Sequence, residues 1–408
     1  MTGAVALSLE QAWLRLEEAV PRHRPESEAV AVKQACGRVL AEDVHAAIDS
    51  PPADNSAMDG FAVNVRDVRL DQSIRLSQRI AAGQAPVPLE TGTAARVFTG
   101  AEIPDGANCV VIQENCEYDA QHVQIRRGLR EGVNIRWRAN DVKQGDRVLR
   151  QGTEIRPQEI GFLLSSGIGQ IHVFKPLRVG VVATGDELVD VTELDGRQTN
   201  EMVLPPGKII ESNSPMILST LAALGCDATA YRAPDTLDAT RRVLSEAVSD
   251  NDAVLTIGGV SVGEEDHVQA ALNTLGRTEF WKINIKPGKP FLFGEAEGTP
   301  VLGLPGNPVS SFVTFHLFCA PFLSKLKGAD FRLPARLPAI AGFSSDKLSD
   351  RVDHLRGRIV SDYPDLVVEP SGTQSSSVQG ALCAADVLIV IPANTQIKRG
   401  QSLRVIRL

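Results

Sequence analysis

The chain has 408 residues, of which 43% are apolar and 5% aromatic, and its formal net charge is −8. This length is too great for one ordinary hydrophobic core, so it predicts two to four domains with clefts between them. The acidic balance argues against a nucleic-acid binder, because phosphate backbones are bound by basic surfaces. An anionic small molecule remains compatible with this charge where lysines gather locally.

Targeting and metal signals are weak. Residues 1–10 (MTGAVALSLE) lack the basic start and apolar stretch of a secretory signal, and no run approaches the roughly 18 apolar residues of a membrane span. The six cysteines are scattered, and no HExxH or Cys/His cluster predicts a zinc site. We therefore expect a cytoplasmic protein with reduced thiols and no membrane contact, in which any metal is a hard ion bound by oxygen atoms.

The first predicted element is a helix. Ser8 and Gln11 have capping-box spacing, and the apolar residues that follow lie on one helical face until Pro21. From about Val30 to Leu149, short apolar runs broken by Gly, Pro, Asn and Asp predict β structure with long loops. A short helix is predicted over 156–167.

Beyond residue 176, predicted strands and helices alternate. The strands are LRVGVVAT, DATAYRA, DAVLTI, FWKINI and PVLGL, and the helices are SPMILSTLAALG, LDATRRVLSEAVS, EDHVQAALNTLG and residues 308–328. Such alternation predicts a doubly wound, mostly parallel sheet with helices on both faces. After residue 328 the pattern returns to β and predicts a small all-β module at the end of the chain.

Polar turns follow four of these strands. They are Gly185-Asp186-Glu187, the segment from Gly258 to Gly263, Lys286 to Lys289, and Pro305 to Pro308. Ligands of an open parallel sheet bind beyond the carboxyl ends of its strands, so the four turns are expected to share one edge.

The glycine turn is a candidate phosphate site. Gly258 and Gly259 let the backbone approach a ligand, and Ser261 and the amides near Gly263 are able to donate to a phosphate. A single such turn is more often a tight connection without a ligand. Several glycine turns with acids and lysines on one edge favour the ligand.

Four acids belong to the same edge. Taken singly, Asp186, Glu187 and Asp266 are explained as residues favoured by a helix dipole. Together with Asp235 they supply oxygen ligands of the kind that bind Mg²⁺ beside substrate phosphates. A cation bound between the acids and the substrate would offset the repulsion between the carboxylates and a phosphate.

Three lysines form the basic concentration near this edge. Lys282 and Lys286 have equal parity, so in one extended segment they point to the same side. They predict an oxyanion pocket, whereas Lys289 is explained equally well as a solvated surface lysine.

The ordered motifs PADNSAMDGFA, RVFTGAEIPDGAN, VVATGDELV, GGVSVGEED, FWKINIKPGKPF and LPGNPVSSF resemble the molybdopterin molybdenumtransferases, the family of bacterial MoeA and the gephyrin E domain. The resemblance covers essentially the whole chain. It implies Mg²⁺-dependent insertion of molybdate into adenylated molybdopterin with release of AMP. It also implies a homodimer with an active cleft shared between subunits, and contacts with molybdopterin-pathway enzymes and acceptor molybdoenzymes.

The resemblance further implies four domains. An N-terminal domain is expected from residues 1–45 together with 145–177, and a β-rich second domain from 46–144. The central α/β domain, similar to molybdopterin adenylyltransferases, is expected over 178–328, and a C-terminal β-barrel over 329–408.

Site residues follow from matching positions. The resemblance assigns catalytic or metal-binding positions to Glu187, Asp235 and Asp266, with Asp186 beside them, and it adds Asp59, Thr99 and Asp141 from the second domain. It assigns substrate contacts to Lys282 and Lys286, to Ser376, and to Arg356 or Arg358.

The chain departs from the family pattern at one informative place. Ala139-Asn140 stands where Gly-Glu is usual, which removes a carboxylate beside Asp141. Two alternatives therefore stay open: a molybdopterin adenylyltransferase, which the central domain also resembles, and a catalytically weakened, gephyrin-like dimeric scaffold. Molybdate-dependent AMP release distinguishes the enzyme from both.

Overall fold

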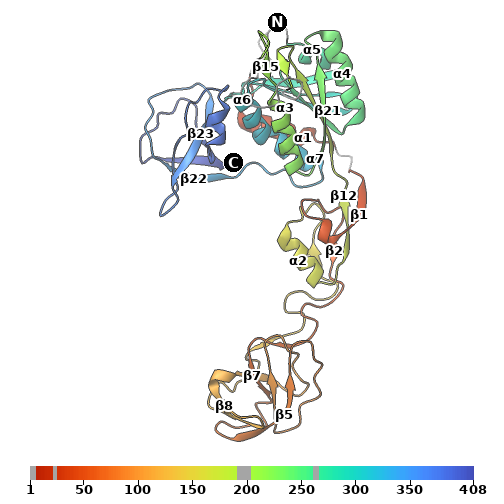
Figure 1. The fold of residues 1–408 in the computed structure, drawn as a ribbon, viewed down its shortest axis with the longest axis vertical. Helices are drawn as coiled ribbons and strands as arrows, with labels where there is room; N and C mark the ends of the chain where they lie inside the picture. Colours follow the sequence, from red (N-terminus) through yellow and green to blue (C-terminus); the bar gives the residue numbers. More distant parts are fainter. Residues whose placement is uncertain (1–5, 22–24, 191–203, 261–265) are drawn as a thin grey trace. The chain divides into compact units, whose positions relative to one another are not determined.

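The structure is a computed structural model that describes residues 6–21, 25–190, 204–260 and 266–408 (Figure 1). The chain forms two compact units, which are described separately here. The first contains residues 1–27, 37–39 and 174–408, and the second contains residues 28–36 and 40–173.

The first unit contains an α/β domain built on a six-stranded sheet in the order β16-β13-β17-β21-β20-β18. The first four strands are parallel, and β20 and β18 are antiparallel to their neighbours. Their bounds are Arg178–Thr184 (β13), Asp227–Ala233 (β16), Ala253–Ile257 (β17), Gly276–Lys282 (β18), Pro290–Ala296 (β20) and Thr299–Leu304 (β21). Every residue of β17 is buried, as expected for an interior parallel strand.

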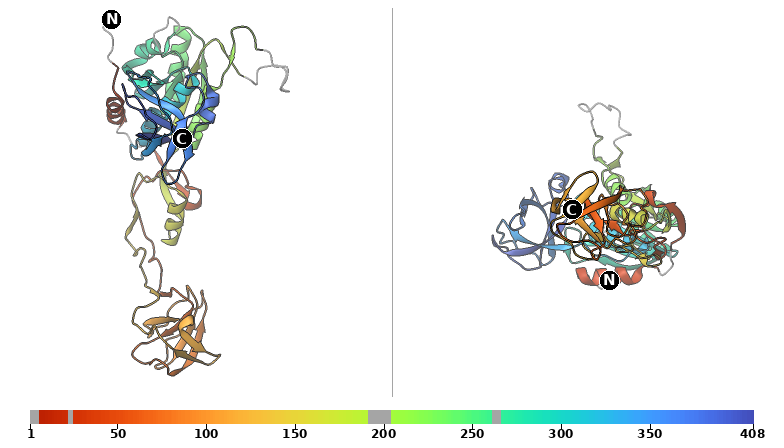
Figure 2. Two further views of the ribbon diagram at one scale, coloured as in Figure 1. Left: turned by 90° about the vertical axis from the view of Figure 1, so that its left-hand side faces the viewer. Right: turned by 90° about the horizontal axis from the view of Figure 1, so that it is seen from below.

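Helices cover both faces of this sheet (Figure 1). One apolar core joins one face to α1, α3, α6 and α7, and a second core joins the other face to α4 and α5. Helix α1 lies against the outside of the domain in both views of Figure 2 and contacts α7. The helices are Leu9–Ala19 (α1), Asn213–Ala223 (α3), Leu237–Asp250 (α4), Val268–Leu275 (α5), Pro308–Thr314 (α6) and Ala320–Leu326 (α7).

The predicted helix over 308–328 is confirmed, with one irregularity. A π-helical turn at Phe315–Cys319 joins α6 to α7. The combined segment Pro308–Leu326 is long and apolar enough to cross a membrane by length and composition, yet 72% of its most apolar window is buried inside the protein. Its side chains pack in the same core as β17 and β21, so it is a core helix of this domain.

The predicted single strand FWKINI is wrong. Strand β18 ends at Lys282, and residues 285–286 form a separate strand, Ile285–Lys286 (β19), in another sheet. Between the two strands the N–H of Ile285 donates to the carbonyl of Ile283, which makes a tight turn, and Ile283 forms a parallel bridge with Leu7. Strand β20 was also absent from the sequence prediction.

The C-terminal module is a closed β-barrel. Its strands follow one another in the order β23-β24-β22-β26-β25, and β25 pairs back with β23. Strand β19 joins this sheet by pairing in parallel with β23. The bounds are Arg336–Ala341 (β22), Val352–Ser361 (β23), Val367–Pro370 (β24), Val387–Ile391 (β25) and Ser402–Arg407 (β26), with a short helix α8 at Gln379–Cys383.

The second unit is β-rich, as predicted. Its main sheet has the order β7-β4-β6-β5-β9-β8. These strands are Gly60–Val63 (β4), Ser73–Ile80 (β5), Ala94–Val97 (β6), Cys109–Ile112 (β7), Cys116–Tyr118 (β8) and His122–Ile125 (β9). The remaining elements are Ser27–Ala31 (β1), Val44–His45 (β2), Asn55–Ser56 (β3), Ile135–Arg136 (β10), Arg147–Leu149 (β11), Pro157–Ser165 (α2) and Gln170–Phe174 (β12).

Candidate active site

Two predicted acids meet where neighbouring parallel strands end. Asp186 follows β13 and Asp235 follows β16, so the parallel pairing of these strands brings the two turns together. The N–H of Asp186 donates to Oδ2 of Asp235 at 2.8 Å, and the N–H of Asp235 donates to Oδ1 of Asp186 at 3.2 Å. Each carboxylate therefore uses one oxygen to fix the other turn.

Glu187 lies at the same strand end and is exposed. Gly185 has φ +141°, and a Cβ built on it would lie 2.6 Å from Oε2 of Glu187. The carboxylate of Glu187 therefore turns back over the end of β13. The backbone carbonyl of Glu187 accepts a hydrogen bond from the N–H of Ile209. This bond continues the parallel pairing of two short strands, Leu188–Val189 (β14) and Ile209–Ile210 (β15).

The glycine turn after β17 packs tightly against β13. Gly258 and Gly259 have φ of +88° and +63°, which favour glycine. A Cβ at Gly258 would lie 2.8 Å from Oγ1 of Thr184, and one at Gly259 would lie 2.8 Å from Cγ2 of Val268. The sequence predicted that these glycines let the backbone approach a ligand. In the structure they let it approach Thr184 and the start of α5, and this packing places the turn next to the end of β13.

The turn after β21 lies next to the glycine turn. A Cβ on Gly306 would be 3.7 Å from Cα of Gly258. The amide of Asn213, at the start of α3, donates to the carbonyl of Gly306 at 2.6 Å. The turns after β13, β17 and β21, which are three of the four predicted polar turns, therefore lie side by side, and the turn after β16 adjoins them.

The KPGK turn lies at this edge because β20, which follows it, starts beside the end of the antiparallel strand β21. Gly288, in the KPGK turn, lies so close to α6 that a Cβ would be 2.4 Å from Cγ2 of Thr314. The first turn of α6 also donates from the N–H of Val309 to the carbonyl of Ser376. The lysine turn and the predicted serine thus lie against the same short helix.

The reason given for grouping Lys282 with Lys286 is wrong. Because β18 ends at Lys282 and β19 belongs to the barrel sheet, the two lysines do not share one extended strand. The ammonium of Lys282 lies 3.7 Å from the ring centroid of Trp281, whereas that of Lys286 lies 3.5 Å from Oδ2 of Asp353. Lys289 is exposed.

The two candidate arginines differ in environment. Arg356 is 1% exposed, and its guanidinium donates to the carbonyls of Thr373 and Ser375. Burial lowers the pKa of this guanidinium. Arg358 is exposed and pairs with Glu369. Arg356 therefore holds the loop that carries Ser376 through hydrogen bonds from the barrel interior.

The second unit brings Asp59 and Thr99 together. The N–H and the hydroxyl of Thr99 both donate to Oδ1 of Asp59 at 2.8 Å. These two bonds lower the pKa of Asp59, the backbone N–H contributing most. Asp141 lies elsewhere in this unit, where its N–H donates to the carbonyl of Ser50.

Two predicted phosphate contacts and one predicted acid lie in or next to the segment 261–265. Ser261 and Gly263 lie outside the described residues, while Asp266 follows directly after that gap and is half-buried. Within the described ranges, no three His, Cys, Asp or Glu side chains gather in an arrangement able to hold a metal ion. The Asp186–Asp235 pair is therefore the centre of the acidic part of the site.

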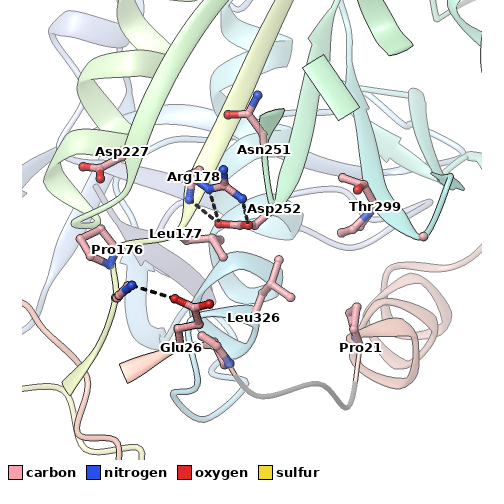
Figure 3. A pocket seen from close by; sticks show the side chains of 14 residues that line it. Pro21, Glu26, Pro176, Leu177, Arg178, Asp227, Asn251, Asp252, Thr299 and Leu326 are labelled. Atoms are coloured by element: carbon pink, nitrogen blue, oxygen red, sulfur yellow. Dashed lines mark hydrogen bonds and ion pairs between the residues drawn. The ribbon is translucent and has the colours of Figure 1, made fainter. Parts of the chain in front are cut away.

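A sizeable cavity lies at the opposite end of the sheet. It has a volume of about 740 Å³, and its lining includes the first residues of three strands, Arg178, Asp227 and Thr299. Two ion pairs occupy its wall: Arg178 pairs with Asp252, as Figure 3 shows, and Lys175 pairs with Glu26. Ligands of parallel sheets bind at the carboxyl ends, so this cavity is not the candidate site.

Sequence reasoning missed two residues, one just before β23 and one within it, that lie close to β19. Arg351 donates to the carbonyl of Ile285 at 3.2 Å, and Asp353 pairs with Lys286 in the parallel register of β19 and β23. Both are part of an ordinary β pattern some 65 residues further along the chain, and that pattern carries no local signal of the pairing.

Known protein families match the chain throughout its length. The MoeA N-terminal region (domain I and II) matches residues 7–167, a probable molybdopterin binding domain matches 180–325, and the MoeA C-terminal region (domain IV) matches 338–408. The molybdopterin molybdenumtransferase of Haemophilus influenzae is 35% identical, covering 94% of each chain. That of Staphylococcus aureus strain Mu50 is 31% identical, covering 92% of this chain and 90% of the relative.

The fold is shared with a solved structure. The molybdopterin biosynthesis MoeA protein of Pyrococcus horikoshii OT3 superimposes with a TM-score of 0.81 at 27% identity, covering 99% of this chain and all of that one. Fold, strand-end site and similarity together define a multidomain α/β enzyme of molybdenum cofactor biosynthesis, a transferase. The chain belongs to the molybdopterin molybdenumtransferase family, which confirms the resemblance inferred from its motifs.

Proposed function

We propose that this protein inserts molybdate into adenylated molybdopterin in a Mg²⁺-dependent reaction that releases AMP. The observation that carries the proposal is the reciprocal pair of Asp186 and Asp235 at the carboxyl edge of the sheet. This pair lies beside a glycine turn whose backbone is suited to a phosphate. Family membership supplies the molybdopterin part of the substrate.

The donor set suits a magnesium ion. Asp186 and Asp235 each use one carboxylate oxygen in their mutual bonds, so the second oxygen of each is the candidate ligand. Mg²⁺ is commonly bound by one or two carboxylates together with substrate phosphates and water. An ion held there supplies charge compensation at the phosphate–phosphate bond that joins the pterin to AMP. Glu187, whose carboxylate folds back over the end of β13, follows Asp186 directly and is a further candidate.

The lysine side of the site is suited to the molybdate dianion. Lys286 offers an ammonium on the turn that packs against α6, and Ser376 lies at the first turn of the same helix. Charge-assisted hydrogen bonds from an ammonium to an oxyanion are among the stronger polar contacts. These two residues would hold the molybdate while the two sulfur atoms of molybdopterin become ligands of the molybdenum. The insertion therefore needs no nucleophile from the protein.

We further propose a cytoplasmic homodimer in which Asp59, Thr99 and Asp141 complete the active cleft of the partner. The support is the family resemblance, together with a carboxylate kept ionised by two bonds from Thr99. All six cysteines are free thiols, which accords with a reducing compartment.

The test is AMP release by the purified full-length protein from adenylated molybdopterin, with molybdate and Mg²⁺ varied independently. We expect release to require both. ATP consumption that forms adenylated molybdopterin without molybdate would instead identify an adenylyltransferase. A stable dimer that binds a partner protein and releases no AMP at high Mg²⁺ would identify the scaffold.

A further inference from the structure

A buried acid of the barrel lies directly behind the lysine of the proposed oxyanion pocket. Asp353, in β23, is 6% exposed. Its Oδ2 lies 3.5 Å from Nζ of Lys286, and its Oδ1 accepts from the hydroxyl of Ser349 at 3.0 Å. The carboxylate thus has one cationic and one neutral partner, each on a different oxygen.

The backbone fixes the position of this acid. Lys286 and Asp353 are opposite residues in the parallel pairing of β19 with β23. The next residues reinforce the pairing, since Arg351 donates to the carbonyl of Ile285 and Asn284 donates to the carbonyl of Asp350. A carboxylate on a paired strand has little freedom to move, so the ammonium is the mobile partner of the two.

The two side chains differ in exposure. The side chain of Lys286 is 33% exposed, and that of Asp353 is 9% exposed. A buried carboxylate is costly unless it is paired and hydrogen-bonded, which Lys286 and Ser349 both satisfy. The ammonium therefore has the acid behind it and its open side toward solvent.

We propose that Asp353 is a positioning residue for the oxyanion substrate. Its carboxylate holds the flexible lysine in one place, so that an arriving molybdate meets an ammonium already in position and does not have to order it. Ordering a lysine side chain on binding otherwise costs affinity. The inference rests on the proposed role of Lys286 in binding molybdate.

The first test is Asp353→Asn, which keeps the shape and the bond to Ser349 but removes the charge. Binding of molybdate alone to the full-length protein is measured by calorimetry, and molybdate-dependent AMP release is measured in parallel. We expect the dissociation constant and the half-saturating concentration of molybdate to rise about tenfold, with the half-saturating concentration of adenylated molybdopterin unchanged. Molybdate binding as tight as in the unmodified protein, or tighter, overturns the proposal.

A matched acid and a conservative variant serve as controls. Asp362 is an exposed acid of the same barrel, so Asp362→Asn should leave molybdate binding unchanged. Asp353→Glu keeps the charge and should bind molybdate more tightly than Asp353→Asn. Equal loss in the Glu and Asn variants contradicts a role for the charge.

A double-variant cycle separates this inference from the proposed function. If Asp353 acts through Lys286, Asp353→Asn should add little to the effect of Lys286→Met, because effects on one shared contact are not additive. Fully additive effects overturn the proposal even where single variants are destabilised. Unchanged molybdate binding in Lys286→Met alone refutes the role of Lys286, whatever Asp353 does.

Discussion

Ala139 occupies a backbone conformation that suits glycine. Its φ is +59°, in the left-handed region, and its N–H is held by the carbonyl of Pro51. The Cβ of an L-residue in this region costs about 1–2 kcal/mol. The family glycine at this position is therefore explained by the turn itself, independently of any ligand.

The change Ala139→Gly should stabilise the second unit by about 1 kcal/mol, since relief of the left-handed strain exceeds the added flexibility of the unfolded chain. Calorimetric unfolding measures the effect. Ala120, an exposed turn residue whose φ is negative, is the matched control, and Ala120→Gly should leave the midpoint unchanged or lower it. A lower midpoint for Ala139→Gly would contradict the strain.

Glu187→Ala should abolish most turnover while leaving the fold intact. The side chain is exposed, so its loss changes the free energy of unfolding by no more than about 0.5 kcal/mol. A rim carboxylate acting on developing charge is expected to contribute on the order of 100-fold in rate. AMP release and thermal unfolding are measured together, with Glu246→Ala, an exposed acid of α4, as the control. Near-normal turnover would remove Glu187 from the mechanism.

Single residues were predictable where their role is tied to a strand end. Asp186 and Asp235 were found because each follows a predicted strand, and parallel pairing then brings them together. Asp353 had no such signal, because its partner Lys286 is far away in the sequence. Arg356 was identified from the family pattern, but whether it faces a ligand or the barrel interior depends on packing that the sequence does not encode locally.

At the scale of elements, β23 contains a buried histidine whose protonation opposes folding. His354 is fully buried, and burial together with the charge of Arg336 lowers its pKa from 6.5 to about 4. Between these values the folded state keeps the ring neutral while the unfolded chain takes up a proton. The contribution of His354 to stability is therefore complete above pH 6.5 and declines as the pH falls toward 4.

Replacing the ring should remove this dependence. On going from pH 7 to pH 5, we expect the unmodified protein to lose about 2 kcal/mol more stability than His354→Met does. Denaturant unfolding at the two pH values measures the difference. His122, an exposed histidine of the second unit, is the control, and His122→Met should retain the full loss. An identical loss in His354→Met would show that this ring does not titrate on unfolding.

Elements were predicted well where a local period defines them. The alternation of strands and helices between residues 177 and 328 was read correctly except at β19 and β20, because the elements show local apolar patterns. The single strand FWKINI failed because its two ends pair with different sheets: Lys282 with Pro290 in the α/β sheet, and Ile285 with Val352 in the barrel. Long-range backbone bonds of this kind leave no period in the sequence.

At the scale of the whole molecule, a mixed dimer tests whether the cleft is shared. Glu187→Ala and Asp59→Ala homodimers should both be inactive. When the two chains associate at random, a shared cleft leaves one intact site in each mixed dimer, so about a quarter of normal AMP release should return. A cleft built within one chain would restore none. The chains are mixed by joint unfolding and refolding. Asp59→Ala protein that is unfolded and refolded alone is the control.

Strand β19 has a consequence for how this molecule can be divided. By sequence, residues 285–286 belong to the α/β domain, but by backbone pairing they belong to the barrel. A chimera that exchanges the C-terminal module at residue 328 therefore separates β19 from its native neighbour, and Lys286 would meet a foreign acid or none. A chimera that keeps this pairing must take residues 285–289 and the barrel from the same parent. The unit that folds together is therefore not one continuous segment of the chain.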